Sequence, residues 1–137
     1  MQLNMTTDYA VRILLYLGIT GRITSSGEIA HEMVIPANYV PNIIKKLRDK
    51  GLVSARYGPK GGYELGKDAN DITLLDVVET MEGSIKINRC LEEDQYCSRD
   101  ATAHCAIHDV YASIQSGLEK TLAASTIAQL VKTSKAS

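Results

Sequence analysis

The sequence predicts a mainly α-helical protein in which a pair of helices is followed directly by a β-hairpin. Residues 25–33 and 38–50 show helical spacing of apolar side chains and are separated only by a short turn, residues 34–36. Residues 58–62, Gly-Pro-Lys-Gly-Gly, are dense turn chemistry between two short runs with strand character. Helix, turn, helix and hairpin in this order are the layout of a winged helix-turn-helix with a two-stranded wing.

The first helix is expected over residues 6–17. Asp8 lies in its first turn, where the helix dipole favours negative charge. Gly18 and Gly21 are expected to end it. The side chains expected to face the core recur at helical spacing: Ala10, Ile13, Leu14 and Leu17.

The helix pair comes next. Ser25 or Ser26 starts the second helix, and Glu28 is expected to complete a capping box from Ser25. The third helix is expected over residues 38–50, with Gly51 closing it. Its inward side chains are predicted to be Tyr39, Ile43, Ile44 and Leu47.

The predicted strands of the wing are residues 52–57 and 63–65, and a fourth helix over residues 72–83 ends at Gly83. Residues 84–104 are polar and show no clean periodicity. A long helix is expected from Cys105 onward, followed by a short helix over 126–131 and a frayed tail over 132–137. The long helix carries apolar side chains at helical spacing: Ile107, Val110, Tyr111, Ile114, Leu118 and Leu122.

The net charge of −1 conceals a difference between the two halves of the chain. Residues 1–67 carry nine Lys and Arg against five Asp and Glu, whereas residues 68–137 carry six against eleven. An isolated basic cluster is more often a solvated surface, but this one falls on the helix pair and hairpin, which indicates a phosphate-binding edge. Its members are Lys45, Lys46, Arg48, Lys50, Arg56, Lys60 and Lys67.

The second helix of such a pair fits the major groove of DNA, and residues at its amino end reach base edges. The candidates for base contacts here are Asn38, Tyr39 and Asn42. Those further along the helix, suited to phosphate contacts, are Lys45, Lys46 and Arg48; those on the wing are Arg56, Tyr57 and Lys60. The alternative is an interaction module, with Tyr39 in the core and Asn38 only a helix cap; Pro41 then lies harmlessly in the first turn.

Three cysteines, Cys90, Cys97 and Cys105, are separated by six and seven residues, and His108 lies one helical turn beyond the third. An odd count without a secretory signal argues against a disulfide framework and favours a metal or redox role. These gaps are long for a zinc knuckle, so spacing alone supports a metal or cluster site and three unrelated thiols equally. No membrane span is apparent, and we expect a cytoplasmic protein with no membrane partner.

No serine–histidine–acid or paired-carboxylate arrangement presents itself, and the glycine run lacks the phosphate-loop pattern Gly-x-x-x-x-Gly-Lys. An enzyme is therefore the class that the sequence supports least.

Taken together, these segments resemble the Rrf2-type winged-helix transcriptional regulators, in particular the branch with the iron–sulfur cluster regulator IscR and the nitric oxide-sensing repressor NsrR. The likeness covers essentially the whole chain. The matching segments are Met1-Gln2-Leu3, Thr7-Asp8-Tyr9-Ala10, Leu47-Arg48, Lys50-Gly51-Leu52-Val53, Gly58-Pro59-Lys60-Gly61-Gly62-Tyr63, Leu65-Gly66-Lys67, Asp76-Val77-Val78 and the three-cysteine segment.

The resemblance implies a homodimer held by the long helix near 105–122 and bound to a roughly palindromic double-stranded DNA operator. It also implies an iron–sulfur cluster that gates operator affinity, with a two-iron, two-sulfide form favoured over a four-iron form. The implied ligands are Cys90, Cys97, Cys105 and His108. Rival fourth ligands are Asp8, reaching from the partner subunit, and His104.

Three segments are expected within one compact unit. Residues 1–83 form the winged helix-turn-helix DNA-binding domain, residues 84–104 the cysteine-bearing sensor loop, and residues 105–137 the dimerisation helix and tail. The sequence departs from relatives at Tyr57, where they commonly carry Arg, and at Pro41-Asn42, where the cluster regulator carries Glu-Gln. The operator sequence therefore does not carry over. Two other functions stay open: a metal-free thiol or disulfide sensor, and a cluster-carrying interaction module that does not bind DNA.

Overall fold

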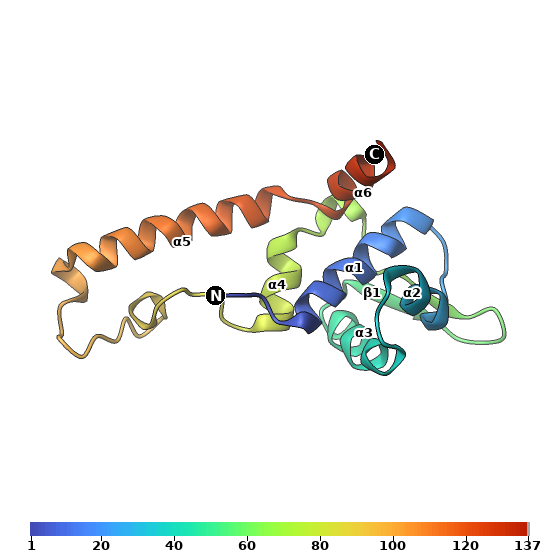
Figure 1. Ribbon diagram of the computed structural model, residues 1–137, viewed down its shortest axis with the longest axis horizontal. Coiled ribbons are helices and arrows are strands. Elements are labelled where there is room, and N and C mark those ends of the chain that lie inside the picture. Colours follow the sequence, from blue (N-terminus) through green and yellow to red (C-terminus); the bar gives the residue numbers. More distant parts are fainter. Residues whose placement is uncertain (137) are drawn as a thin grey trace.

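The chain folds into a head of packed helices from which one long helix projects as an arm (Figure 1). A computed structural model describes residues 1–136, the last of these by its backbone alone. The helices are α1 (Met5–Thr20), α2 (Ser26–Met33), α3 (Val40–Asp49), α4 (Leu74–Glu82), α5 (Ala106–Ala124) and α6 (Ile127–Ala136), and the strands are β1 (Val53–Arg56) and β2 (Gly62–Leu65).

Helix α1 lies at the centre of the head and buries the predicted apolar stripe, Ala10, Ile13, Leu14 and Leu17. It continues past Gly18, which corrects the expected helix end. A Cβ atom on Gly18 would lie 2.7 Å from Val131 Cγ2, so this glycine lets α6 pack closely against α1. Gly21 ends the helix instead, in the left-handed conformation at φ 58°, with its N–H bonded to the carbonyl of Leu17.

The start of α2 contains only half of the predicted capping box. The Ser25 hydroxyl accepts from the Glu28 N–H at 3.1 Å. The Glu28 carboxylate does not return to Ser25; it accepts from the Tyr16 hydroxyl at 2.7 Å and from the Arg22 guanidinium at 2.8 Å. The Tyr16 bond attaches α2 to α1, and the Arg22 bond attaches α2 to the loop that follows α1.

Helix α3 begins at Val40, later than predicted, because residues 37–39 form a short 3-10 turn ahead of it. Pro41 therefore lies in the first turn, where its missing N–H costs nothing. Tyr39 is 39% exposed rather than buried, and its ring packs edge-to-face against Tyr9 with the ring centroids 5.6 Å apart. Four side chains of α3 are buried: Val40, Ile43, Ile44 and Leu47.

Strands β1 and β2 pair antiparallel with Val53 opposite Leu65, and they form the predicted wing. Thr24 adds a rung to the hairpin, because its N–H and C=O both bond to Tyr63 at 2.8 Å. A Cβ atom on Gly62 would lie 2.5 Å from the Thr24 carbonyl oxygen, so only glycine allows this approach. The predicted winged helix-turn-helix fold class is confirmed.

Helix α4 begins with a complete capping box between Thr73 and Asp76. Helix α6 returns to the head: Thr73 and Thr126 pair backbone to backbone, and Ile127 is fully buried in the core. The chain is helical through Ala136, which corrects the expected frayed tail; the last residue of that tail, Ser137, lies outside the described residues.

Helix α5 and the sensor loop form the arm, with the loop running back along the helix (Figure 1). Between residues 84 and 104 the described structure is irregular apart from two short 3-10 turns, Arg89–Leu91 and Thr102–His104. Among the described residues, none of the helices is sufficiently long and apolar to span a bilayer.

Candidate nucleic-acid interface and cysteine pocket

The outer face of α3 presents the side chains that the sequence assigned to DNA. Helix α3 buries its apolar side and leaves its polar side exposed, so it is amphipathic with the core behind it. A groove of about 490 Å³ lies beside this face, between α3 and the start of α1. Its polar and basic lining includes Asn38, Tyr39, Asn42, Lys45 and Lys46.

Asn38 and Tyr39 lie in the 3-10 turn that leads into α3, and Asn42 lies in its first turn. The side chain of Asn38 makes no hydrogen bond that caps the helix, contrary to the capping alternative. Both asparagine side chains are thus exposed at the amino end of the helix, where base contacts are made in a helix-turn-helix.

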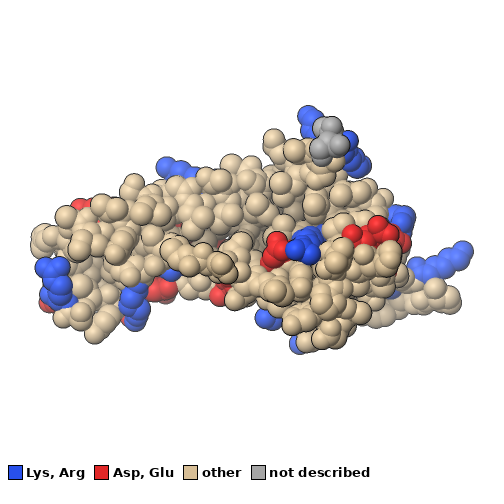
Figure 2. Space-filling model, in the orientation of Figure 1, with Lys and Arg blue, Asp and Glu red and all other residues tan. Residues whose placement is uncertain are grey.

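Basic side chains extend this surface onto the wing, and Figure 2 shows such side chains at the end of the head where the hairpin projects. Within residues 1–136, no acidic side chain forms an ion pair with Lys45, Lys46 or Lys60. Arg56 differs, because its Nε donates to Glu64 Oε1 at 3.0 Å. Its charge is therefore partly balanced within the hairpin.

Arg48 also has a hydrogen-bond partner on this surface. Its Nη2 donates to the hydroxyl of Tyr57 at 3.0 Å, which joins α3 to the residue directly before the wing turn. Tyr57 is 84% exposed, so this bond lies on the surface of the head.

A separate pocket lies at the start of α5. It has a volume of about 240 Å³, and all three cysteines and His108 line it. Cys90 is buried and lies between two side-chain nitrogens: His108 Nδ1 at 3.0 Å from its Sγ, and Asn88 Nδ2 at 3.2 Å. The Sγ of Cys105 accepts from the His108 N–H at 3.4 Å. The fold therefore brings together residues 18 positions apart in the sequence.

Hydrogen bonds around the Cys97 thiol favour its ionised form. Its pKa is lowered, first by hydrogen bonds from the backbone N–H groups of Ala101 and Arg99. A thiolate is the form that binds metals and reacts as a nucleophile. All three cysteines are free thiols.

The donor set of this pocket suits an iron–sulfur cluster, since three sulfur ligands and one imidazole match the ligand chemistry of such groups. Within residues 1–136, no three His, Cys, Asp or Glu side chains are already drawn together around a single metal position. His104 is exposed and does not line the pocket. Asp8, on α1 in the head, accepts from Arg12 Nη2 at 2.7 Å.

Sequence reasoning missed two polar residues that hold the sensor loop. Gln115 on α5 is 4% exposed; its Oε1 accepts from the Ile87 N–H at 2.9 Å and its Nε2 donates to the Ile85 carbonyl at 3.2 Å. The other is Asn88, beside Cys90. Neither carries a sequence signal, because a glutamine on a helix and an asparagine in a loop are both typical of solvated positions.

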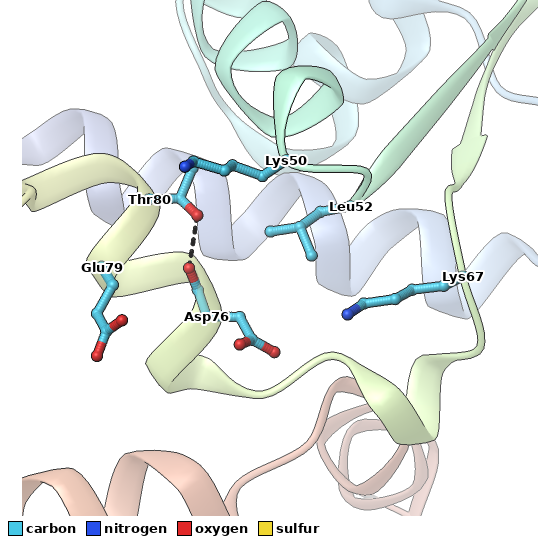
Figure 3. A pocket seen from close by; sticks show the side chains of 6 residues that line it. All are labelled: Lys50, Leu52, Lys67, Asp76, Glu79 and Thr80. Carbon is cyan, nitrogen blue, oxygen red and sulfur yellow. Dashed lines mark hydrogen bonds between the residues drawn. The ribbon is translucent and has the colours of Figure 1, made fainter.

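A third hollow, of about 310 Å³, lies between α4 and the segments just before β1 and just after β2 (Figure 3). Figure 3 shows Lys50 and Lys67 extending toward α4, where Asp76 and Glu79 also line the hollow. Thr80 Oγ1 donates to the Asp76 carbonyl at 2.7 Å. With two positive and two negative side chains, this hollow has no preference for an anion, unlike the surface of α3.

The family model described as "Iron-dependent Transcriptional regulator", Rrf2, matches residues 3–133. The chain belongs to the Rrf2 family. It is 29% identical over 127 residues to a protein of Aquifex aeolicus that is described as an HTH-type transcriptional regulator. The match covers 92% of this chain and 88% of that protein. The Rrf2 chain is thus a transcriptional regulator of a DNA-binding family, and its relatives are not enzymes.

Solved Rrf2-type structures share the fold. CymR, the global cysteine regulator of B. subtilis, superposes with a TM-score of 0.82 at 22% identity, covering 96% of this chain and 97% of that one. IscR of T. potens superposes with a TM-score of 0.78 at 23% identity, covering 98% of this chain and 88% of that one. These likenesses extend over the head and the arm together.

Proposed function

We propose that this Rrf2 protein is a DNA-binding regulator whose operator affinity is gated by an iron–sulfur cluster held by Cys90, Cys97, Cys105 and His108. The observation that supports this most is that all four side chains line one pocket. Three sulfur donors and an imidazole from a single chain fit a two-iron cluster best, since such clusters accept histidine in place of cysteine. His104 is exposed and does not line the pocket, which leaves Asp8 of a partner subunit as the rival fourth ligand.

The reading surface is formed by α3 and the wing. We assign base contacts to Asn38, Tyr39 and Asn42, and contacts that position the protein on the DNA backbone to Lys45, Lys46 and the wing residues. Asparagine at the amino end of a recognition helix is suited to paired hydrogen bonds with adenine.

A second copy of the chain completes the regulator. The apolar stripe of α5 is exposed in the single chain: Ile107, Val110, Ile114 and Leu118. Such a stripe on a helix is stable in water only when covered, and pairing of two such helices covers both. A dimer with two heads binds a palindromic operator. The free thiols are the state expected in a reducing cytoplasm, where we place the protein.

The gating follows from what α5 joins. His108, in its first turn, lines the pocket, while the apolar stripe further along forms the dimer surface. Holding Cys90 and Cys97 to this turn fixes the sensor loop against α5. A change in that loop alters the seating of α5 on its partner and so the spacing of the two heads. The bound group supplies the ligand bonds that fix the loop and the sensitivity to iron, oxidants or nitric oxide.

The test is anaerobic purification of the full chain, followed by visible absorbance and counts of iron and sulfide. DNA binding is then compared before and after removal of the metal. Iron and sulfide near two per chain and a change in binding are expected. Replacing His108 with Cys should retain the cluster but shift its spectrum and reduction potential, while Ala should lose it. Colourless protein that cannot be reconstituted, yet binds DNA, would contradict the cluster.

A metal-free thiol sensor is the second candidate. Cys90, Cys97 and Cys105 line the same pocket as free thiols, so oxidation would also restrain the sensor loop. The measurement is intact-protein mass spectrometry with and without peroxide, on protein shown to contain no iron. A disulfide between two of these cysteines that changes DNA affinity would favour this candidate; unchanged affinity of the oxidised protein would exclude it.

A further inference from the structure

The bond between Arg48 and Tyr57 links the two elements that the proposed function assigns to DNA. Arg48 lies on the exposed side of α3, and Tyr57 is the residue directly before the Gly58-Pro59 turn of the wing. The guanidinium Nη2 donates to the phenol oxygen at 3.0 Å. Both side chains lie in solvent, so the folded core does not require the bond.

The chemistry of the pair leaves donors free. Arginine has five N–H groups and accepts no hydrogen bond, so the Tyr57 hydroxyl can only accept from Arg48. Its own proton must therefore point elsewhere. The remaining N–H groups of Arg48 also have no acceptor among the hydrogen bonds of the described residues. A cation and a directed O–H donor thus stand side by side, which suits an anion with several oxygens.

The place of the pair identifies the anion. In a winged helix, the recognition helix lies in the major groove and the wing approaches the neighbouring minor groove. The sugar–phosphate backbone separates these two grooves, so a residue pair between α3 and the wing faces a backbone phosphate. The acids nearby in sequence are occupied or lie elsewhere: Glu64 is bound by Arg56, and Asp49 lines the groove beside α1.

We propose that Arg48 and Tyr57 act as one phosphate clamp that fixes the wing relative to α3 when the protein binds DNA. This rests on the proposed DNA-binding function of α3 and the wing. Arg48 then contacts the backbone through a geometry that Tyr57 sets. The clamp contributes equally to every DNA sequence, because a phosphate carries no sequence information.

The test uses the full chain, with every variant purified in the same way, and a 30-base-pair duplex of random sequence. Such a duplex requires no knowledge of the operator. Binding is followed by fluorescence anisotropy from about 50 mM to 200 mM salt, a range over which phosphate contacts change affinity strongly. Four proteins form a cycle: wild type, Tyr57→Phe, Arg48→Ala and the double variant. Lys120→Ala is the control for the charge change, because Lys120 is exposed on α5, away from the DNA surface and the cysteine pocket.

Tyr57→Phe should weaken binding roughly tenfold, the loss of one hydrogen bond to a charged group, and leave the salt dependence unchanged because a hydroxyl displaces no counterion. Arg48→Ala should lower the slope of log K against log salt by about 0.9. Adding Tyr57→Phe to Arg48→Ala should cost nothing further. Melting temperatures should match wild type, since both side chains are exposed.

Independent effects in the double variant, or full affinity in Tyr57→Phe, would overturn the clamp while leaving DNA binding intact. Wild-type protein that binds the duplex without salt dependence, or not at all, would instead overturn the proposed function together with the clamp.

Discussion

Helix α1 in the head and α5 in the arm are both amphipathic and of similar length, 16 and 19 residues, yet they bury opposite kinds of side chain. In α1 the buried residues are mostly apolar and lie within the head's own core. In α5 the one buried residue is Gln115, and the apolar stripe is exposed. The head therefore completes its core with its own residues, whereas the arm does not.

This difference separates the tasks of the two regions. Because the core of the head is formed by its own residues, the head holds the proposed DNA surface in place. Under the proposed function, the arm depends on a partner and on a filled pocket, and it responds to both because few of its own contacts hold it in place. The proposed function thus places regulation in the arm, at the surfaces that a single chain leaves incomplete.

Replacing Ile114 with Asp gives the largest expected effect, because it places a charge in the middle of the apolar stripe. The dimer should dissociate to a monomer with a folded head, as measured by sedimentation and circular dichroism. Ser116→Asp is the control, since Ser116 is exposed and lies roughly 200° around the helix. A stable dimer in Ile114→Asp would remove the stripe from the interface and break the comparison.

Replacing a leucine with alanine once in the head and once in the arm sharpens the comparison between the two regions. Leu17→Ala in the head should lower the free energy of unfolding by about 2–5 kcal/mol, because Leu17 is 1% exposed in the core. Leu118→Ala in the arm should act through the dimer, so its cost should appear as a melting temperature that depends on protein concentration. Denaturant and thermal unfolding at several concentrations measure both. A concentration-independent loss in Leu118→Ala would mean that the arm is stable by itself.

Gln115→Leu tests the two hydrogen bonds by which Gln115 holds the sensor loop against α5. It leaves the Ile87 N–H and the Ile85 carbonyl without partners, at a cost of about 1–3 kcal/mol for each group that stays buried. We expect faster hydrogen exchange at Ile87 and faster loss of the bound metal in air, with the head unchanged. Gln129→Leu, at an exposed position on α6, is the control and should do neither.

The head could be predicted closely from sequence because its elements obey local rules. The stripe of α1 and the glycine-rich wing turn each follow from local sequence patterns. The exceptions arose from tertiary contacts. Helix α1 continues past Gly18, and this glycine allows α6 to pack against it. The Glu28 carboxylate bonds to Tyr16 and Arg22 instead of returning to Ser25.

The arm was predictable in composition but not in contacts. The spacing of the cysteines did not reveal that Cys90 Sγ and His108 Nδ1 lie 3.0 Å apart, because the irregular loop between the two residues follows no periodicity. Gln115 and Asn88 were invisible for the same reason. The Arg48–Tyr57 bond joins two elements whose separate roles the sequence predicted, but whose contact depends on the angle between helix and hairpin.

Lys60→Ala should have the smallest effect and the one most confined to the head. Lys60 is exposed in the wing turn, so its loss should not alter stability, dimerisation or the visible spectrum. If it contacts one phosphate, the slope of log K against log salt should fall by about 0.9, equally for all DNA sequences. Lys120→Ala removes the same charge from the exposed surface of α5 and should leave the slope unchanged. Equal slopes of log K against log salt in the two variants would show that the wing tip does not contact DNA. A changed visible spectrum in Lys60→Ala would show that head and arm are not independent, because a charge on the wing would then act on the cysteine pocket.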